Sequence, residues 1–281
     1  FITNPFSKRK IEAEISTIDI KDPLKFHTLA SLTIDLSQDM YCNTMDIGQC
    51  GNNFFSFIKN PRYDKYGKEY AHVNADVENG MPKILVYDWN GNKTASLGPA
   101  RIIAFRGTHS RAEWEHNFDC TELPESKVGL NIKGYFHKDF ATVGKKIWDN
   151  YKKYITESKI PVIITGHSRG AALAEMVHVI AKKHFLNKNI DFPIYCIAHA
   201  PPPSMHLTDE DRNELTKHIY GIVNGDDAIP RFFAATIIKI YNAYSAVKDL
   251  LFDICTDHYS DEDCTINANQ IIGILLDILS P

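Results

Sequence analysis

The sequence predicts one α/β domain over residues 1–281, built on a mostly parallel central sheet with helices on both faces. Short β-branched runs alternate with longer amphipathic segments between residues 162 and 223, a pattern typical of a parallel sheet covered by helices. Hydrophobic residues make up 44% of the chain and charged residues 23%, so the apolar side chains suffice for a sizeable core. The absence of an internal repeat or a Pro/Gly-rich linker favours a single domain.

The first half of the chain predicts helices followed by a pair of strands. Residues 26–59 carry apolar side chains at mixed helical spacing. Residues 84–88 and 100–105 are strand-like, and the Asn-Gly-Asn sequence at 90–92 is a strong turn signal after the first strand. Residues 109–131 are polar and irregular, so we expect a loop there.

The second half alternates helices with strands. Residues 138–154 have a helical apolar face, and residues 162–165 form a β-branched strand. A helix is expected at 171–185, with further strands at 194–198 and 219–223. Ligands of parallel α/β sheets bind at the carboxyl ends of the strands, so the functional residues should lie directly after them.

Charge and hydropathy argue against a nucleic-acid partner and against a membrane-spanning helix. The formal net charge is -4, and the chain has no dense basic stripe, so we expect no nucleic-acid partner. No stretch reaches the roughly 18 apolar residues of a membrane-spanning helix. Any contact with a membrane should therefore be peripheral.

The cysteines and a glycosylation sequon favour a secreted over a cytoplasmic location. Cys196 lies in an apolar strand pattern and is expected to be a buried free thiol. Two pairs close in sequence are candidates for disulfides, which form in oxidising compartments: Cys42 with Cys50, and Cys255 with Cys264. The Asn-Lys-Thr sequon at 92–94 lies on the expected turn and points the same way.

The segment Gly-His-Ser-Arg-Gly at 166–170 is the strongest chemical signal. It follows a β-branched strand and opens an Ala-rich helix, which is the context of a nucleophile elbow with Ser168 as the nucleophile. The helix N-terminus would place backbone N–H groups near developing negative charge. The alternative is a glycine turn with a serine that caps the helix.

A serine nucleophile needs a base, and the base needs an orienting acid. Asp226 and Asp227 follow the strand at 219–223, where the acid is expected, although both could be ordinary loop residues. His258 is the one histidine after them and is therefore the expected base, although a histidine in polar sequence is often a surface residue. We expect this triad to converge at the carboxyl ends of adjacent strands.

The oxyanion of an ester intermediate needs preorganised donors. One should be the backbone N–H of Arg169, directly after the nucleophile. The second is expected from the Phe-Arg-Gly-Thr segment at 105–108, which ends the strand at 100–105. The alternative for this segment is a simple glycine turn at a strand end.

These motifs together resemble the class 3 lipase family, which includes fungal triacylglycerol lipases and sn-1-specific diacylglycerol lipases. The resemblance runs from about residue 84 to 231 and rests on three segments in the same order: Phe105 to Thr108, Gly166 to Ala171, and Asp227 to Arg231. The run Ala-His-Ala-Pro-Pro-Pro at 198–203 is similar to the diacylglycerol lipase branch. The resemblance implies an α/β-hydrolase fold.

The resemblance also selects site residues. It implies Asp227 rather than Asp226 as the acid, Thr108 at the oxyanion site, and residues 109–131 as the lid, with Trp114 matching a tryptophan there. Phe118 and Leu123 are the other apolar side chains of this segment. A second candidate for the lid, residues 237–251, has helical apolar spacing that is more typical of core packing. The chain departs from the family at 132–135, where Ile-Lys-Gly-Tyr lacks the usual histidine, and around His258, where no match is found.

The function expected from these residues is hydrolysis of carboxylic esters of lipids, acylglycerols or phospholipids, through an acyl-enzyme. No cofactor or metal is expected, and the partner should be a membrane or lipid-droplet surface. Two alternatives remain open: an esterase of the same fold that acts on soluble esters, and a non-catalytic lipase-like binding module.

Overall fold

The computed structural model describes residues 18–41, 67–76, 78–108, 122–124, 127, 129, 131–225, 227 and 230. The chain divides into two compact units, residues 1–231 and 232–281, and every described residue lies in the first. The single-domain organisation therefore stays a prediction.

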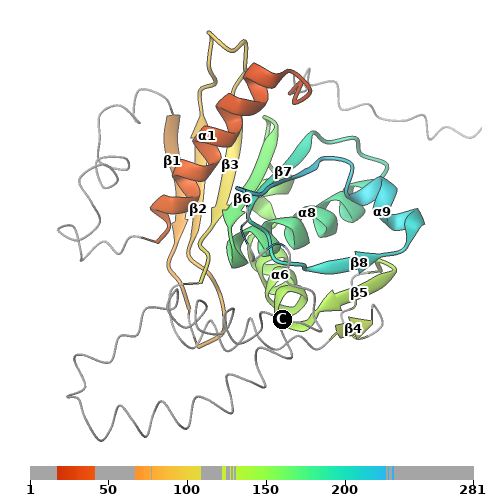
Figure 1. Ribbon diagram of the computed structural model, residues 1–281. Helices are drawn as coiled ribbons and strands as arrows, with labels where there is room; N and C mark the ends of the chain where they lie inside the picture. Colours follow the sequence, from red (N-terminus) through yellow and green to blue (C-terminus); the bar gives the residue numbers. More distant parts are fainter. Residues whose placement is uncertain are drawn as a thin grey trace, which may run out of the picture. The chain divides into compact units, whose positions relative to one another are not determined.

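A six-stranded sheet in the order β1-β2-β3-β6-β7-β9 forms the centre of the first unit (Figure 1). Its strands are β1 (Gly67–Val73), β2 (Ile84–Trp89), β3 (Ala100–Phe105), β6 (Val162–His167), β7 (Ile194–His199) and β9 (Ile219–Ile222). The strands β3, β6, β7 and β9 pair in parallel, whereas β1 and β2 pair antiparallel at one side. The expected mostly parallel sheet is confirmed.

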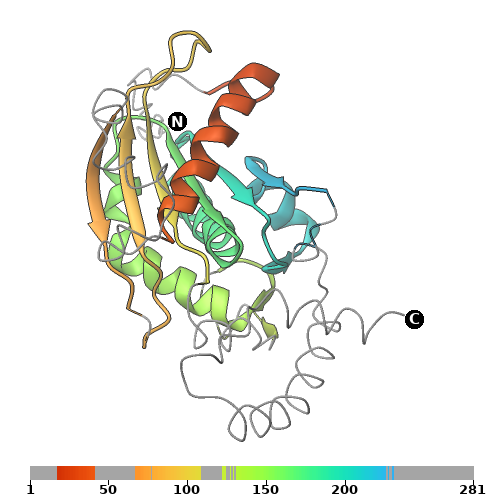
Figure 2. The same ribbon diagram turned by 60° about the vertical axis from the view of Figure 1, so that its left-hand side comes forward.

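Helices cover both faces of this sheet (Figures 1 and 2). Helix α1 (Pro23–Asp39) packs on one face, where Leu29 and Leu36 are completely buried against alternate residues of β2, β3 and β6. Helices α6 (Lys138–Tyr151) and α8 (Arg169–Asn187) pack on the other, with α7 (Lys153–Thr156) following α6. Both faces of β3 and of most of β6 are buried, which explains why residues 102–105 and 162–164 are apolar without alternation.

Helix α8 is buried on almost every side, unlike α6. Four residues on the face expected from the sequence, Leu173, Val177, Ile180 and Ala181, are buried, and so are most of the others. The helix lies between the sheet, α6 and α9 (Asp209–Leu215), so little of its surface faces solvent. A helix enclosed in this way has weak amphipathic periodicity.

Four strands and one helix of the described residues lack a clear sequence signal. They are β1 at the sheet edge, the small sheet β4-β5-β8 (Glu122–Pro124, Gly134–His137, Met205–Leu207), and α9. Gly134 permits the β5–β8 pairing, because a Cβ there would overlap the carbonyl of His206. Strand β4 falls within the expected lid, and its Leu123 packs against the core instead of facing outward.

The turn signal after β2 is confirmed. Gly91 has a φ of 88°, and an added Cβ would overlap the backbone carbonyl of Leu97, so only glycine fits there without a shift. Asn92 and Leu97 exchange backbone hydrogen bonds of 2.9 Å in both directions. The turn lies at the amino ends of the parallel strands, away from the edge where the expected site residues gather.

Cys196 in β7 is buried and free, as expected, and burial raises the pKa of its thiol well above its usual value. The other cysteines lie outside the described residues. In the part of the chain that the structure describes, no helix is both long and apolar enough to cross a membrane.

A buried carboxyl on α8 predicts a pH-dependent stability. Burial raises the pKa of Glu175 from 4.5 to about 7, and a 2.8 Å hydrogen bond from the Ser204 hydroxyl offsets this only partly. The folded protein binds this proton more tightly than the unfolded chain, so the stabilisation is present below pH 4.5 and is lost as the pH rises through 7.

Glu175→Gln should remove this pH dependence. We expect the variant to gain up to about 3 kcal/mol in free energy of unfolding relative to wild type at pH 8, and much less at pH 4.5. Urea unfolding at both pH values measures the difference. Glu157→Gln is the control, because Glu157 is exposed. Parallel pH profiles for wild type and Glu175→Gln would contradict the prediction.

Candidate active site

Ser168 lies at a sharp turn between β6 and α8, at the carboxyl edge of the parallel strands. Its φ of 54° and ψ of -125° are unusual for a residue with a side chain, and such conformations cost about 1–3 kcal/mol. The surrounding structure holds it there, because the Ser168 N–H donates to the His199 carbonyl at 2.9 Å and the Ser168 carbonyl accepts from Ala171 at 2.9 Å. The side chain is only half-buried.

The two glycines beside Ser168 allow this turn to be so tight. A Cβ at Gly166 would overlap the backbone of Gly170, one turn further on. A Cβ at Gly170 would overlap the carbonyl of Phe105 at the end of β3. The Gly-x-Ser-x-Gly spacing therefore lets β6, the start of α8 and the end of β3 meet at backbone distance.

The expected oxyanion loop, residues 105–108, packs directly on this turn. A Cβ at Gly107 would overlap the His167 carbonyl, and the Arg106 N–H donates to the carbonyl of Lys83, the residue just before β2, at 3.0 Å. Thr108 is half-buried at its end. The N–H of Arg169 is one of the first amides of α8, which have no acceptor within the helix. The fold thus brings both expected donor segments to one place.

Asp227 follows β9, and its backbone N–H donates to the Asn224 carbonyl at 3.1 Å. The negative charge of Asp227 raises the pKa of His167 in the elbow. Burial lowers the same pKa by more, so the net shift is downward. The strands before Ser168 and Asp227 are not adjacent, however, because β7 lies between β6 and β9. The expectation of adjacent strands was wrong in this detail.

Two contacts, one buried and one partly buried, join helix α1 and the residues just after it to this site, and neither has a signal in the sequence. The Tyr41 hydroxyl, just beyond α1, lies 3.0 Å from Nδ1 of His167. Thr33 Oγ1 lies 2.9 Å from Nε2 of His199, the residue whose carbonyl holds the Ser168 amide. Burial lowers the pKa of His199 to about 4, with a further contribution from His167, so its ring is neutral at pH 7.

The side chain of Arg169 points away from solvent into a buried ion pair. Its Nη2 lies 2.9 Å from Oδ2 of Asp139 on α6 and donates to the Gly80 carbonyl at 2.9 Å. Sequence reasoning identified the backbone of Arg169 and not this side-chain role, because its partners lie 30 and 89 residues away.

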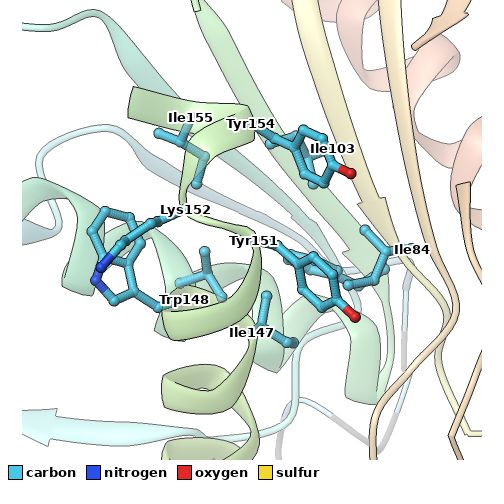
Figure 3. Close-up of a pocket in the computed structure, with 10 residues that line it drawn as sticks. Ile84, Ile103, Ile147, Trp148, Tyr151, Lys152, Tyr154 and Ile155 are labelled. Atoms are coloured by element: carbon cyan, nitrogen blue, oxygen red, sulfur yellow. The ribbon is translucent and has the colours of Figure 1, made fainter. Parts of the chain in front are cut away.

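A small apolar cavity lies among the described residues between α6, α7 and the sheet, and Ser168 does not line it. Figure 3 shows side chains from α6 and α7, such as Ile147, Tyr151 and Ile155, on one side of it and Ile84 and Ile103 of the sheet on the other. Its volume of about 10 Å³ leaves room for about one water-sized sphere, so it is too small for an acyl chain.

Three of the expected site residues, His258, Trp114 and Phe118, lie outside the described residues. Among the described residues, no group of three or more His, Cys, Asp or Glu side chains is arranged to hold a metal ion.

Residues 102–237 match the sequence model of the family "Lipase (class 3)", over the strands and turns that carry Ser168 and Asp227. The chain is a relative of the class 3 lipases. A curated relative, "Secreted mono- and diacylglycerol lipase 3" of Gibberella zeae, is 26% identical over 139 residues. That match covers 46% of this chain and 43% of the relative, so the chain spans less than half the length of the curated protein it matches.

Solved structures agree with this relation at the level of the fold. A lipase from Rhizopus microsporus var. chinensis has a TM-score of 0.51 at 14% identity, covering 73% of this chain and 68% of that one. A variant of MDLA from Penicillium cyclopium has a TM-score of 0.51 at 18% identity, covering 74% of both chains. The α/β-hydrolase fold expected for this relative of the class 3 lipases is confirmed.

Proposed function

We propose that this class 3 lipase relative is a serine hydrolase that cleaves carboxylic esters of lipids through an acyl-enzyme. The observation that carries the proposal is the backbone of Ser168, held at a φ of 54° on a turn packed against the 105–108 loop. That arrangement presents a hydroxyl at the carboxyl edge of the sheet, beside a helix N-terminus. An ordinary serine cap would need no strained backbone.

In the proposed reaction, Ser168 Oγ attacks the ester carbonyl carbon while His258 takes the hydroxyl proton. Asp227 orients the imidazole and stabilises its positive charge. The backbone N–H groups of Thr108 and Arg169 donate to the oxyanion of the tetrahedral intermediate. The proton on His258 then passes to the leaving alcohol, and water activated by the same histidine hydrolyses the acyl-enzyme to release the acid.

We infer an acylglycerol or phospholipid at a lipid surface as the substrate. The fungal relative is named a mono- and diacylglycerol lipase and is described as secreted, which supports the acylglycerol class and a secreted location for this chain as well. Residues 109–131 would form the lid, with Trp114 and Phe118 as apolar contacts. Binding at the surface of a membrane or droplet needs only such exposed apolar side chains.

The test is activity on a short-chain ester measured as its concentration crosses the solubility limit. A lipase should show an abrupt rise in rate at that limit, because the apolar surface favours an open entrance to the site. The rise should shrink in a Trp114→Ser/Phe118→Ser double variant. A Leu24→Ser/Tyr70→Ser variant is the matched control, since it removes two apolar side chains of α1 and β1 that are 58% and 54% exposed.

Smooth saturation through the solubility limit, unchanged in the Trp114/Phe118 variant, would contradict the lipid-surface assignment. It would favour the esterase alternative, in which the same site acts on soluble esters. No hydrolysis of any ester in either form would favour the non-catalytic binding module.

A further inference from the structure

The side chain of Arg169 joins three segments around the nucleophile. Its Nε and Nη2 atoms lie 3.2 and 2.9 Å from Oδ2 of Asp139, in the first turn of α6. Nη2 also donates to the carbonyl of Gly80, in the connector between β1 and β2. Arg169 itself is the first residue of α8 and directly follows Ser168. One guanidinium therefore ties the elbow to two separate parts of the chain.

This ion pair is deeply buried, and burial offsets much of the stabilisation that an ion pair can give. The side chains of Arg169 and Asp139 are 1% and 8% exposed. Removing two charges from water carries a desolvation cost that their attraction often fails to repay, so apolar side chains of similar volume frequently stabilise such a site equally well. Among the described residues, Nη1 of Arg169 is buried and has no hydrogen-bond partner, which adds to the cost.

The surroundings of the pair would accept apolar side chains. Val143 of α6 is buried close by, with its Cγ2 at 3.4 Å from the place of a Cβ on Gly80, and Arg169 Nη2 lies 3.7 Å from the same point. Stability alone thus does not require an arginine here. What the guanidinium provides, and an apolar side chain lacks, is a set of directional hydrogen bonds that fix the residue from two sides.

The backbone N–H of Arg169 is one of the two groups expected to stabilise the oxyanion. On the proposed function, the Arg169 N–H donates to the oxyanion, and such a donor is effective only if its direction is set before the reaction begins. The strained backbone of Ser168, the residue before Arg169, makes that direction harder to maintain, because relaxation of Ser168 would lower the free energy and turn the next N–H. Side-chain anchors at Asp139 and Gly80 oppose this relaxation.

We propose that Arg169 is a positioning residue: its buried side chain, held by Asp139 and Gly80, orients its own backbone N–H as an oxyanion donor. This inference rests on the proposed hydrolase function. It concerns the side chain, whereas the expected oxyanion role concerns only the backbone. The proposal therefore predicts that changing the side chain alters transition-state stabilisation although the N–H group itself remains.

The experiment compares three variants with wild type on a water-soluble short-chain ester. Arg169→Leu removes the anchors, Arg169→Leu/Asp139→Leu replaces the whole pair by apolar side chains, and Asp139→Asn keeps the side-chain shape without the charge. The measurements are kcat, KM, the melting temperature, and the Kd of a phenylboronic acid, which forms a tetrahedral adduct with a reactive serine and mimics the oxyanion intermediate.

We expect Arg169→Leu to lower kcat about 10- to 100-fold with KM within a factor of about two, since the lost interaction acts in the transition state. The boronic acid Kd should rise by a similar factor. The double variant should recover much of the melting temperature, because no unpaired buried charge remains, yet kcat should stay low. Asp139→Asn should lie between wild type and Arg169→Leu.

Arg101→Leu is the matched control. Arg101 also pairs with an aspartate, Asp88, through hydrogen bonds of 2.7 and 2.8 Å. This pair lies at the amino ends of β3 and β6, whereas Ser168 follows the carboxyl end of β6. This variant should lose stability while kcat and the boronic acid Kd remain as in wild type.

Recovery of kcat together with the melting temperature in the double variant would overturn the proposal, since the ion pair would then serve the fold alone. Wild-type kcat and boronic acid affinity in Arg169→Leu would overturn it as well. Failure of the hydrolase function gives a different result: wild type itself would neither hydrolyse the ester nor bind the boronic acid.

Discussion

Ser168→Ala should lower kcat by about 10⁴- to 10⁶-fold, because the members of a serine triad act as a unit and the residual rate comes from binding and the oxyanion donors. The fold should be preserved, since alanine keeps the Cβ and the backbone contacts of Ser168 with His199 and Ala171. A fluorophosphonate should label wild type at Ser168 and leave the variant unlabelled. Ser158→Ala is the control and should keep full activity. The Ser158 hydroxyl donates to the carbonyl of Ile160, between α7 and β6.

A second variant at the same position separates strain from chemistry. Glycine adopts a φ of 54° without the cost that a side chain brings, so Ser168→Gly should be inactive but more stable than Ser168→Ala. The difference in melting temperature reflects the strain that the elbow holds, less the cost of ordering glycine, which is the more flexible residue in the unfolded chain. An active Ser168→Ala variant, or labelling that persists in it, would show that the nucleophile is elsewhere.

Asp227→Asn should lower kcat by about 10⁴-fold with little change in fold, since an amide cannot hold the base in the required tautomer or stabilise its charge. Asp226→Asn is the natural comparison, because it is the alternative acid in the same loop, and it should cost less than about tenfold. Steady-state kinetics and circular dichroism on both variants decide the assignment. The opposite order of effects would make Asp226 the acid.

Local sequence was enough to predict the nucleophile elbow and the central strands. Apolar, β-branched runs predict β2, β3, β6, β7 and β9 close to their observed bounds. For β2, β3, β6 and β7 the reason is burial on both faces, which favours apolar residues along the strand, whereas β9 is only partly buried. The glycines at 166 and 170 are informative for a similar reason: each marks a close backbone approach that a Cβ would block. The contact at Gly166 is with Gly170, four residues on, whereas the contact at Gly170 is with the distant Phe105, yet in both cases the glycine itself marks the position in the sequence.

The short elements left no comparable pattern. Strands β4, β5 and β8 have three or four residues each, too few for periodicity to show, and they exist because they pair with one another. Leu123 illustrates the consequence. In the sequence it belongs with the apolar side chains of the expected lid, whereas in the structure it packs on the core.

The sequence by itself determined the central strands β2, β3, β6, β7 and β9, the helices α6 and α8, and the sharp turn at Ser168. The tertiary structure alone decided which side chains support that turn. Tyr41 reaches His167 across 126 residues, Thr33 reaches His199 across 166, and Arg169 reaches Gly80 across 89. Partners so far apart share no periodicity or spacing, because their contact depends on how the whole sheet and its helices pack.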